Sequence, residues 1–97
     1  MNLIKKQTGD TLEIKLEGRL DTTTAPALDA ELQQLADVKH VVLDFEKVDY
    51  LSSAGLRVLL AGQKRIAIQG DLTLKNVCPA VMEIFEMTGF ADLLTIQ

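Results

Sequence analysis

The sequence of 97 residues contains no tryptophan, a single cysteine (Cys78) and a single histidine (His40). One cysteine excludes an internal disulfide framework and any zinc site built from several cysteines. One histidine likewise excludes a metal cluster that draws on several histidine ligands. With three phenylalanines and one tyrosine, the chain must build its core mostly from aliphatic side chains. We therefore expect neither a metal site nor a disulfide.

The sequence also lacks long stretches of one chemical character. Lysine and arginine form no stripe and the net charge is −4, which disfavours a protein that binds the phosphate backbone of nucleic acids. No apolar run approaches the ~20 residues that a helix needs to cross a bilayer. Lys5, Lys6 and Asp10 interrupt the beginning of the chain, so no targeting segment is expected. These absences predict a cytoplasmic protein without membrane insertion.

What is present is the composition of a globular domain, with 47% hydrophobic and 25% charged residues. Such a composition argues against an intrinsically disordered chain. Because a chain of roughly 100 residues folds as one unit, we expect residues 1–97 to form a single domain.

Hydrophobic periodicity and glycine positions divide the chain into alternating strands and helices. Apolar residues at every second position predict a half-buried strand over 11–17, which a turn at 8–10 joins to an earlier strand over 2–6. Alternating strands and helices imply parallel strand pairs, and the opening hairpin makes the sheet mixed. The predicted fold is therefore α/β, in the order β-β-α-β-α-β-α with a short last strand. The remaining elements are expected as a helix over 25–36, a buried central strand over 40–45, a loop over 46–51, a helix from Ser52 closed by Gly70, a strand over 71–77, a helix from Pro79 ended by Gly89, and a strand over 93–96.

Motifs of enzymes and nucleotide-binding proteins are missing. The chain has no G-x-G-x-x-G, no G-x-x-x-x-G-K-[S/T] and no G-x-S-x-G. A Ser–His catalytic pair would have to use His40, which opens a predicted buried strand. Cys78 precedes a predicted helix, where a thiol could be reactive, but a small and partly buried apolar role is the simpler interpretation. We expect no enzyme and no cofactor.

The segment from Asp49 to Leu56 is the most unusual part of the chain. Its two serines, Ser52 and Ser53, stand where a helix begins, and serine is a favoured N-cap worth about 1 kcal/mol relative to alanine. Gly55 would cost its helix about 1 kcal/mol, which indicates that a backbone or a partner surface approaches closely there.

A functional interpretation of the same segment is a serine that becomes phosphorylated. The free N–H groups of a helix N-terminus would hold a phosphoryl group on Ser53. The group would add about −1.5 to −2 charges and repel a bound partner without unfolding the domain. We expect an exposed apolar patch around Ser53 that includes Tyr50 and Leu56.

Four further segments stand out in order along the chain: Gly18-Arg19-Leu20-Asp21 with Thr24-Ala25, His40 to Phe45, Leu51 to Leu59, and Cys78 to Val81 with Phe85 to Phe90. They resemble the corresponding segments of the STAS domain family, and within it those of the stand-alone bacterial anti-sigma factor antagonists. The resemblance implies partner switching. The unphosphorylated antagonist binds an anti-sigma factor that is also a serine kinase, ATP-dependent phosphorylation of one serine separates them, and a phosphatase resets the chain.

Aligning the family's D-S-S-G on Gly55 implies that Ser53 is the phosphorylated residue. The family's aspartate then falls on Ser52, which remains as a competing acceptor, and its second serine falls on Ala54. Asp21 and Thr24 correspond to the loop that flanks this site, where Asp21 is either a contact to the kinase or simply a turn aspartate. The implied partner-binding residues are Asp21, Thr24, Tyr50, Ser52, Ala54, Gly55 and Leu56.

Two other functions remain open. The chain could be a STAS scaffold subunit of a transporter or of a stress-signalling complex, without a phosphorylation switch. An enzyme using Cys78 or a Ser–His pair is the third class. The short, self-contained chain favours the stand-alone antagonist, and nothing in the sequence indicates an oligomeric state.

Overall fold

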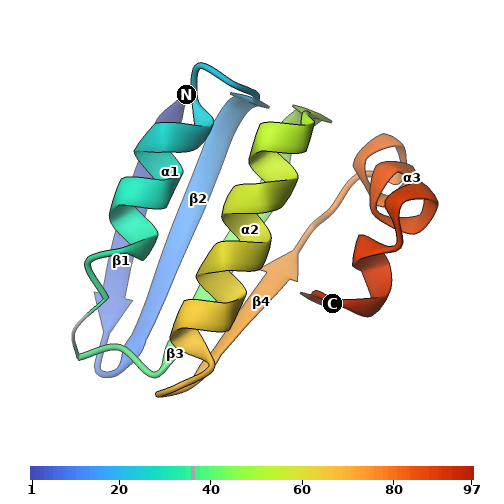
Figure 1. Ribbon diagram of the computed structural model, residues 1–97. Coiled ribbons are helices and arrows are strands. Elements are labelled where there is room, and N and C mark those ends of the chain that lie inside the picture. Colours follow the sequence, from blue (N-terminus) through green and yellow to red (C-terminus); the bar gives the residue numbers. More distant parts are fainter. Residues whose placement is uncertain (36) are drawn as a thin grey trace.

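In the computed structural model, which describes residues 1–35 and 37–97, one mixed sheet carries the helices (Figure 1). Its strands lie in the order of the sequence: β1 (Asn2–Thr8), β2 (Thr11–Leu20), β3 (His40–Leu51), β4 (Asp71–Lys75) and β5 (Thr95–Ile96). β1 is antiparallel to β2, and every later pair is parallel. The predicted α/β fold with a mixed sheet is confirmed.

Three helices connect the parallel strands: α1 (Ala25–Leu32), α2 (Ser53–Ile66) and α3 (Pro79–Thr88), which the short 3₁₀ helix η1 (Phe90–Asp92) follows. α1 and α2 lie side by side across one face of the sheet, and α3 lies beyond β4 (Figure 1). α3 meets the sheet through Phe85, whose ring centroid is 6.4 Å from that of Phe45 in β3. No helix in the described ranges is both long and apolar enough to cross a membrane.

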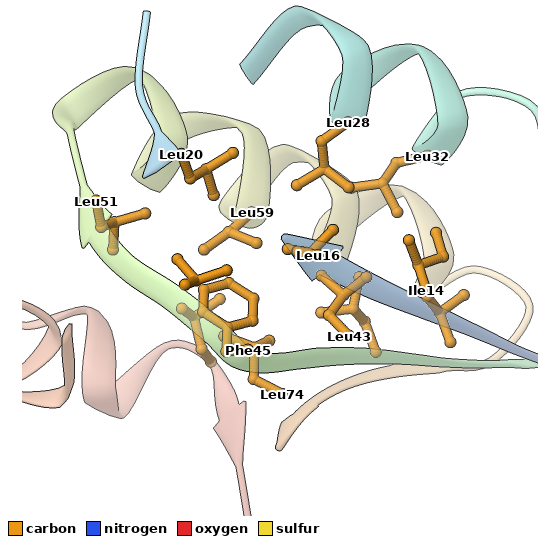
Figure 2. Close-up of a cluster of buried hydrophobic side chains, with 14 of the residues drawn as sticks. Ile14, Leu16, Leu20, Leu28, Leu32, Leu43, Phe45, Leu51, Leu59 and Leu74 are labelled. Carbon is orange, nitrogen blue, oxygen red and sulfur yellow. The ribbon is translucent and has the colours of Figure 1, made fainter. Parts of the chain in front are cut away.

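The core lies between the sheet and the helices and is almost entirely aliphatic, as the composition predicts (Figure 2). Alternation along β2 turns every second side chain toward α1 and α2, so the predicted half-buried strand is confirmed. Complete burial of one leucine or isoleucine side chain contributes about 1.5–3 kcal/mol. The residues with no exposed area include Ile14, Leu16, Leu28, Leu32, Leu43, Phe45, Leu59 and Leu74.

The opposite face of β2 carries charged side chains. Glu13 pairs with Lys75 of β4 at 3.3 Å, and Glu17 pairs with Lys47 of β3 at 3.4 Å. These partly exposed ion pairs contribute little to stability, about 0–1 kcal/mol each. They show that this face of the sheet meets solvent rather than an apolar layer.

The expected loop over 46–51 is wrong, because β3 continues as a strand to Leu51. Its second half pairs with the end of β2, where Gly18 faces Val48 and Leu20 faces Leu51. The register shifts between Lys15 and Glu17 and again between Gly18 and Leu20. The pairing that extends β3 is long-range, so the local sequence did not indicate it.

Several boundaries also differ from the expected ones. α1 ends at Leu32, and the last residue of the helix expected over 25–36, Ala36, lies outside the described residues. β4 ends at Lys75 rather than 77, because Asn76 adopts a left-handed φ of 58° that no strand continues. η1 occupies part of the last connection, and β5 is confined to Thr95–Ile96. The predicted start of α3 at Pro79 and its end at Gly89, with φ of 81°, are confirmed.

Candidate functional site

The predicted site residues come together where β2 and β3 end. These strands are parallel neighbours, so the loop after β2 and the start of α2 emerge at the same edge of the sheet. The backbone N–H of Ser52 donates to the carbonyl oxygen of Leu20 at 2.9 Å, which joins the two segments directly. The edge at the carboxyl ends of parallel strands is where α/β proteins place their binding sites.

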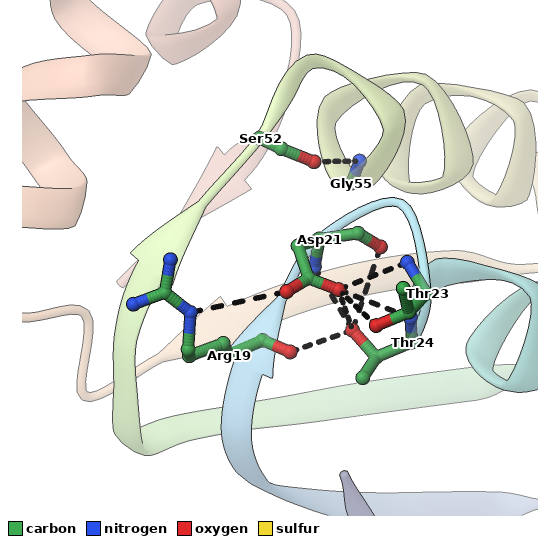
Figure 3. Close-up of polar contacts among 6 residues, drawn as sticks. All are labelled: Arg19, Asp21, Thr23, Thr24, Ser52 and Gly55. Carbon is green, nitrogen blue, oxygen red and sulfur yellow. Dashed lines mark hydrogen bonds and ion pairs between the residues drawn. The ribbon is translucent and has the colours of Figure 1, made fainter.

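Ser52 is the N-cap of α2. Its backbone is extended, and its hydroxyl oxygen accepts a long hydrogen bond of 3.4 Å from the N–H of Gly55 (Figure 3). The side chain is half-buried. Serine and aspartate are comparably good N-caps, so Ser52 supplies the capping chemistry that an aspartate would supply at this position. The capping interpretation of this serine is confirmed.

Ser53 is the first residue of α2, and its side chain is exposed. Across residues 1–35 and 37–97 no hydrogen bond involves its hydroxyl group. The two neighbouring serines therefore differ: one hydroxyl is engaged in the cap and the other is open to an approaching molecule. A phosphoryl group on Ser53 would lie at the positive end of the helix dipole.

The close approach expected at Gly55 is present, and it comes from within the chain. A Cβ atom there would lie 2.8 Å from Leu51 Cδ1 and 3.0 Å from the carbonyl oxygen of Leu20. The first turn of α2 therefore packs directly on the ends of β2 and β3. Gly55 is itself buried and offers no surface to a partner.

The expected exposure of Leu56 is wrong, because its side chain is only 7% exposed and joins the core. Leu56 lies three residues before the fully buried Leu59 and shares its inward face of the helix. Tyr50 is 39% exposed, as expected. Its ring packs under Arg19, whose guanidinium carbon lies 4.0 Å from the ring centroid. The exposed apolar surface near Ser53 thus includes the tyrosine but neither Leu56 nor Gly55.

Asp21 shapes the loop after β2 (Figure 3). Its Oδ1 accepts hydrogen bonds from the hydroxyl of Thr23 at 2.7 Å and from the backbone N–H groups of Thr23 at 2.9 Å and Thr24 at 3.2 Å. The pKa of Asp21 is lowered, chiefly by the hydrogen bond from the Thr23 hydroxyl and next by the one from the Thr23 backbone. The turn role of this aspartate is therefore present in the structure. Its other oxygen, Oδ2, lies 3.8 Å from Arg19 Nε.

Thr24 closes the same loop from the other side. Its hydroxyl donates to the carbonyl oxygen of Arg19 at 2.6 Å and accepts from the backbone N–H of Asp21 at 2.9 Å. The threonine is the residue before α1, yet its side chain makes no capping bond to that helix. It therefore fixes the loop that flanks Ser53 rather than the start of α1.

A groove of about 320 Å³ runs between α1 and α2 beside the site. Sequence reasoning did not find it, because it depends on how the two helices pack. The available signal was the row of small or short residues at 54, 58 and 61, which helical spacing places on one face of α2. A larger cavity of about 430 Å³ lies next to Lys5 and Leu35 and contains none of the predicted site residues. The groove is lined by Thr22, Ala25, Pro26, Asp29, Ala54, Arg57, Val58 and Ala61.

The structure separates the candidate catalytic residues. His40 begins β3 and pairs with Asp71 at 3.1 Å, whereas Ser52 follows the end of the same 12-residue strand. At about 3.3 Å per residue the histidine is far beyond hydrogen-bond reach of either serine. The Cys78 thiol is half-buried and lies 3.5 Å from the carbonyl oxygen of Val48. The part of the chain that the structure describes holds no cluster of metal-ligating side chains.

Known proteins resemble the chain along nearly its whole length. A family profile described as "Mlab, STAS domain" matches residues 4–95. BtrV of Bordetella bronchiseptica is 40% identical over 84 residues, which cover 84% of this chain and 72% of BtrV. The anti-sigma-B factor antagonist of Bacillus subtilis (strain 168) is 30% identical over 102 aligned positions, which cover 100% of this chain and 91% of that protein. The structure of the anti-sigma factor antagonist SpoIIAA in its unphosphorylated form matches with a TM-score of 0.84 and 22% identity, over 99% of this chain and 88% of that one.

Proposed function

Because the chain belongs to the STAS domain family, we propose that it acts as an anti-sigma factor antagonist by partner switching. In its unphosphorylated form it binds an anti-sigma factor that is also a serine kinase, and the sigma factor is released. The kinase transfers the γ-phosphoryl group of ATP to Ser53 Oγ, which loses its proton, and ADP leaves. A phosphatase hydrolyses the phosphoserine and resets the cycle. On this proposal residues 1–97 form one cytoplasmic STAS domain that binds and is modified but catalyses no reaction.

The observation that carries the proposal is the difference between the two adjacent hydroxyl groups. Ser52 uses its oxygen in the N-cap of α2 and is half-buried, whereas Ser53 is exposed and its hydroxyl is free of any hydrogen bond to the described residues. A kinase needs an accessible hydroxyl that its catalytic base can reach. The difference therefore favours Ser53 as the acceptor, with Ser52 holding the helix start in place.

The surroundings of Ser53 suit a switch that acts through charge. A phosphoryl group adds about −1.5 to −2 charges at neutral pH, and a partner surface pressed against it meets repulsion and a desolvation penalty. Beneath the site, Gly55 packs closely against Leu20 and Leu51. The packing that supports the start of α2 therefore does not involve the Ser53 side chain. The proposed modification thus changes the surface and leaves the fold unchanged. We also propose that Asp21 Oδ2 and the Tyr50 ring contribute to the partner surface.

One observation favours a second candidate, a STAS scaffold subunit of a transporter or of a stress-signalling complex. Ser52 stands where the family's phosphorylation motif has an aspartate, so the acidic neighbour of the acceptor is absent. A scaffold would use the same exposed edge without the phosphoryl step. The two candidates separate on whether a kinase modifies Ser53.

The test is to incubate the purified chain with ATP and the anti-sigma factor kinase encoded by the same genome, and to map the modification by mass spectrometry. We expect a single phosphoryl group on Ser53. Ser53→Ala should abolish it, while the matched control Ser52→Ala should still accept it. Modification of Ser52 in the wild-type protein would contradict the assignment of Ser53. A chain that neither binds the kinase nor accepts phosphate would favour the scaffold.

A further inference from the structure

The charges of α2 differ from those of the rest of the chain. The helix carries Arg57, Lys64 and Arg65 and no acidic residue, whereas the whole chain has a net charge of −4. All three basic side chains are exposed. Ser53, which is also exposed, precedes Arg57 by four residues, the spacing at which side chains on a helix are neighbours.

Arg57 lies at the rim of the groove between α1 and α2. No carboxylate within the described ranges lies within ion-pair distance of its guanidinium group. The one acidic side chain in the groove, Asp29, is already engaged: Arg65 lies 4.0 Å from its Oδ1 and the Gln33 amide donates to its Oδ2 at 2.6 Å. The groove therefore presents a cation that no described carboxylate pairs with, beside the short apolar side chains of Ala54 and Val58.

Two kinds of anion have the chemistry to pair with Arg57. A guanidinium group binds a carboxylate or a phosphate through paired, charge-assisted hydrogen bonds. A carboxylate from a partner would reach Arg57 over the groove, and a phosphoryl group on Ser53 would reach it from one helical turn away. The phosphoryl group carries more charge and is held on the same helix, so it has the advantage of an intramolecular ligand.

We propose that the groove between α1 and α2 binds an apolar segment of the anti-sigma factor that carries a carboxylate, and that Arg57 pairs with this carboxylate. When Ser53 is phosphorylated, its phosphoryl group pairs with Arg57 instead and so withdraws Arg57 from the partner. The proposal rests on the proposed function and names the contact through which phosphorylation acts. Release of the partner then has two causes: the phosphoryl group repels the partner surface, and the partner's carboxylate loses its ion pair with Arg57. Arg57 and Ala61, which line the groove, share the exposed side of α2 with Ser53.

The pairing within the helix is tested without any partner. Phosphoserine is incorporated genetically at position 53, and its second pKa is measured by ³¹P NMR in the wild-type, Arg57→Ala and Lys64→Ala backgrounds. The second pKa of phosphoserine is about 6. We expect it to be lower in the wild type than in Arg57→Ala by roughly half a unit, and unchanged by Lys64→Ala, which removes the same charge farther along the helix. Equal values in the wild type and Arg57→Ala would overturn the proposed pairing.

The docking contact is tested by calorimetric binding of the unphosphorylated variants to the purified anti-sigma factor. We expect Arg57→Ala to weaken binding about tenfold or more, Arg57→Lys to weaken it less, and Lys64→Ala to change it by less than about twofold. If the wild type and Arg57→Ala bind the anti-sigma factor equally well, this inference is overturned and the proposed function stands. A wild-type chain that binds no anti-sigma factor would overturn the proposed function as well.

Discussion

The carboxylate of Asp44, in the middle of β3, accepts a hydrogen bond of 3.1 Å from the side-chain amide of Asn76, in the turn that leaves β4. The same oxygen accepts from the backbone N–H of Glu46 at 3.0 Å. Asp44 is the only buried charged residue within the described part of the chain, at 6% exposure. The bond therefore ties the central strand to the connection that leads into α3.

The pKa of Asp44 reflects this arrangement. Burial acts to raise the pKa, but the hydrogen bonds from the Glu46 backbone and the Asn76 amide, with the positive charges of Lys75 and Lys15, lower it below the ordinary 3.8. The ionised form is thus favoured in the folded protein. Acid titration of this one carboxylate should be visible in the stability of the fold.

We predict that Asp44→Asn reduces the sensitivity of the protein to acid. Because folding lowers the pKa of Asp44, its ionised form stabilises the fold above pH 3.8, and this stabilisation is lost as the pH falls through the folded-state pKa. Urea unfolding of both proteins between about pH 6 and pH 2 measures the difference. The wild type should lose more free energy of unfolding than the variant over the acid range. Asp21, whose pKa is also lowered, titrates in both proteins and cancels; parallel curves would contradict the prediction.

We predict that replacing Asn76 by alanine destabilises the protein. Its φ of 58° is left-handed, which costs a residue with an ordinary side chain about 1–2 kcal/mol. Asn76→Ala also removes the hydrogen bond to Asp44, so we expect a loss of about 2 kcal/mol in the free energy of unfolding. Asn76→Gly removes the same hydrogen bond but adopts the backbone conformation freely. The alanine variant should therefore unfold at a lower urea concentration than the glycine variant, and the reverse order would show that the backbone is not strained.

A methyl group at Gly55 should destabilise the protein even though alanine is the better helix former. Its Cβ would lie 2.9 Å from Leu20 Cγ and 3.0 Å from the Leu20 carbonyl oxygen, and backbone does not move aside cheaply. Overpacking of this kind costs about 1–3 kcal/mol, against a gain in helix propensity of about 1 kcal/mol. We expect Gly55→Ala to lower the melting temperature.

Gly62, in the same helix, is the matched control for that substitution. There the three atoms nearest to a Cβ would all belong to the Leu32 side chain, the nearest being Cδ1, the far end of a flexible side chain, at 2.6 Å. A leucine terminus can rotate away, so Gly62→Ala should cost clearly less than Gly55→Ala in thermal unfolding. Equal losses would mean that the Leu20 backbone is not what confines the first turn of α2.

The cap at Ser52 predicts a difference between two substitutions. Ser52→Ala removes the acceptor for the Gly55 N–H, and because that bond is 3.4 Å long, we expect a loss near the lower end of the usual range for caps, about 0.5–1 kcal/mol. Ser52→Asp restores an N-cap acceptor and should be as stable as the wild type. Urea unfolding of the wild type and the two variants measures these differences in the free energy of unfolding. An aspartate variant as unstable as the alanine variant would show that the cap contributes nothing.

Local patterns were sufficient for much of the fold. The alternation of Leu12, Ile14 and Leu16 with charged residues predicts β2, and Pro79 and Gly89 mark the two ends of α3. These signals are contained within a few consecutive residues. They also indicated which serines stand at the start of α2.

Features that depend on long-range packing were not predictable in this way. The second half of β3 forms because the end of β2 pairs with it, although Glu46 and Lys47 interrupt the apolar run. The groove beside Arg57 and the bond between Asp44 and Asn76 likewise join elements that are distant along the chain. The burial of Leu56, by contrast, was within reach of the local pattern, because its spacing of three residues from Leu59 places both on the face of α2 that packs on the sheet.

The hairpin between β1 and β2 has a practical consequence for studying this protein. Gly9, in that turn, has φ of 62°, which disfavours any side chain, so a label belongs on its exposed neighbours Thr8 or Asp10. β2 spans 10 residues from this turn to Leu20, so the hairpin and Ser53 lie at opposite ends of the sheet. A fluorophore or an immobilisation tag attached at the hairpin tip would report on association while standing clear of the proposed docking surface at the other end.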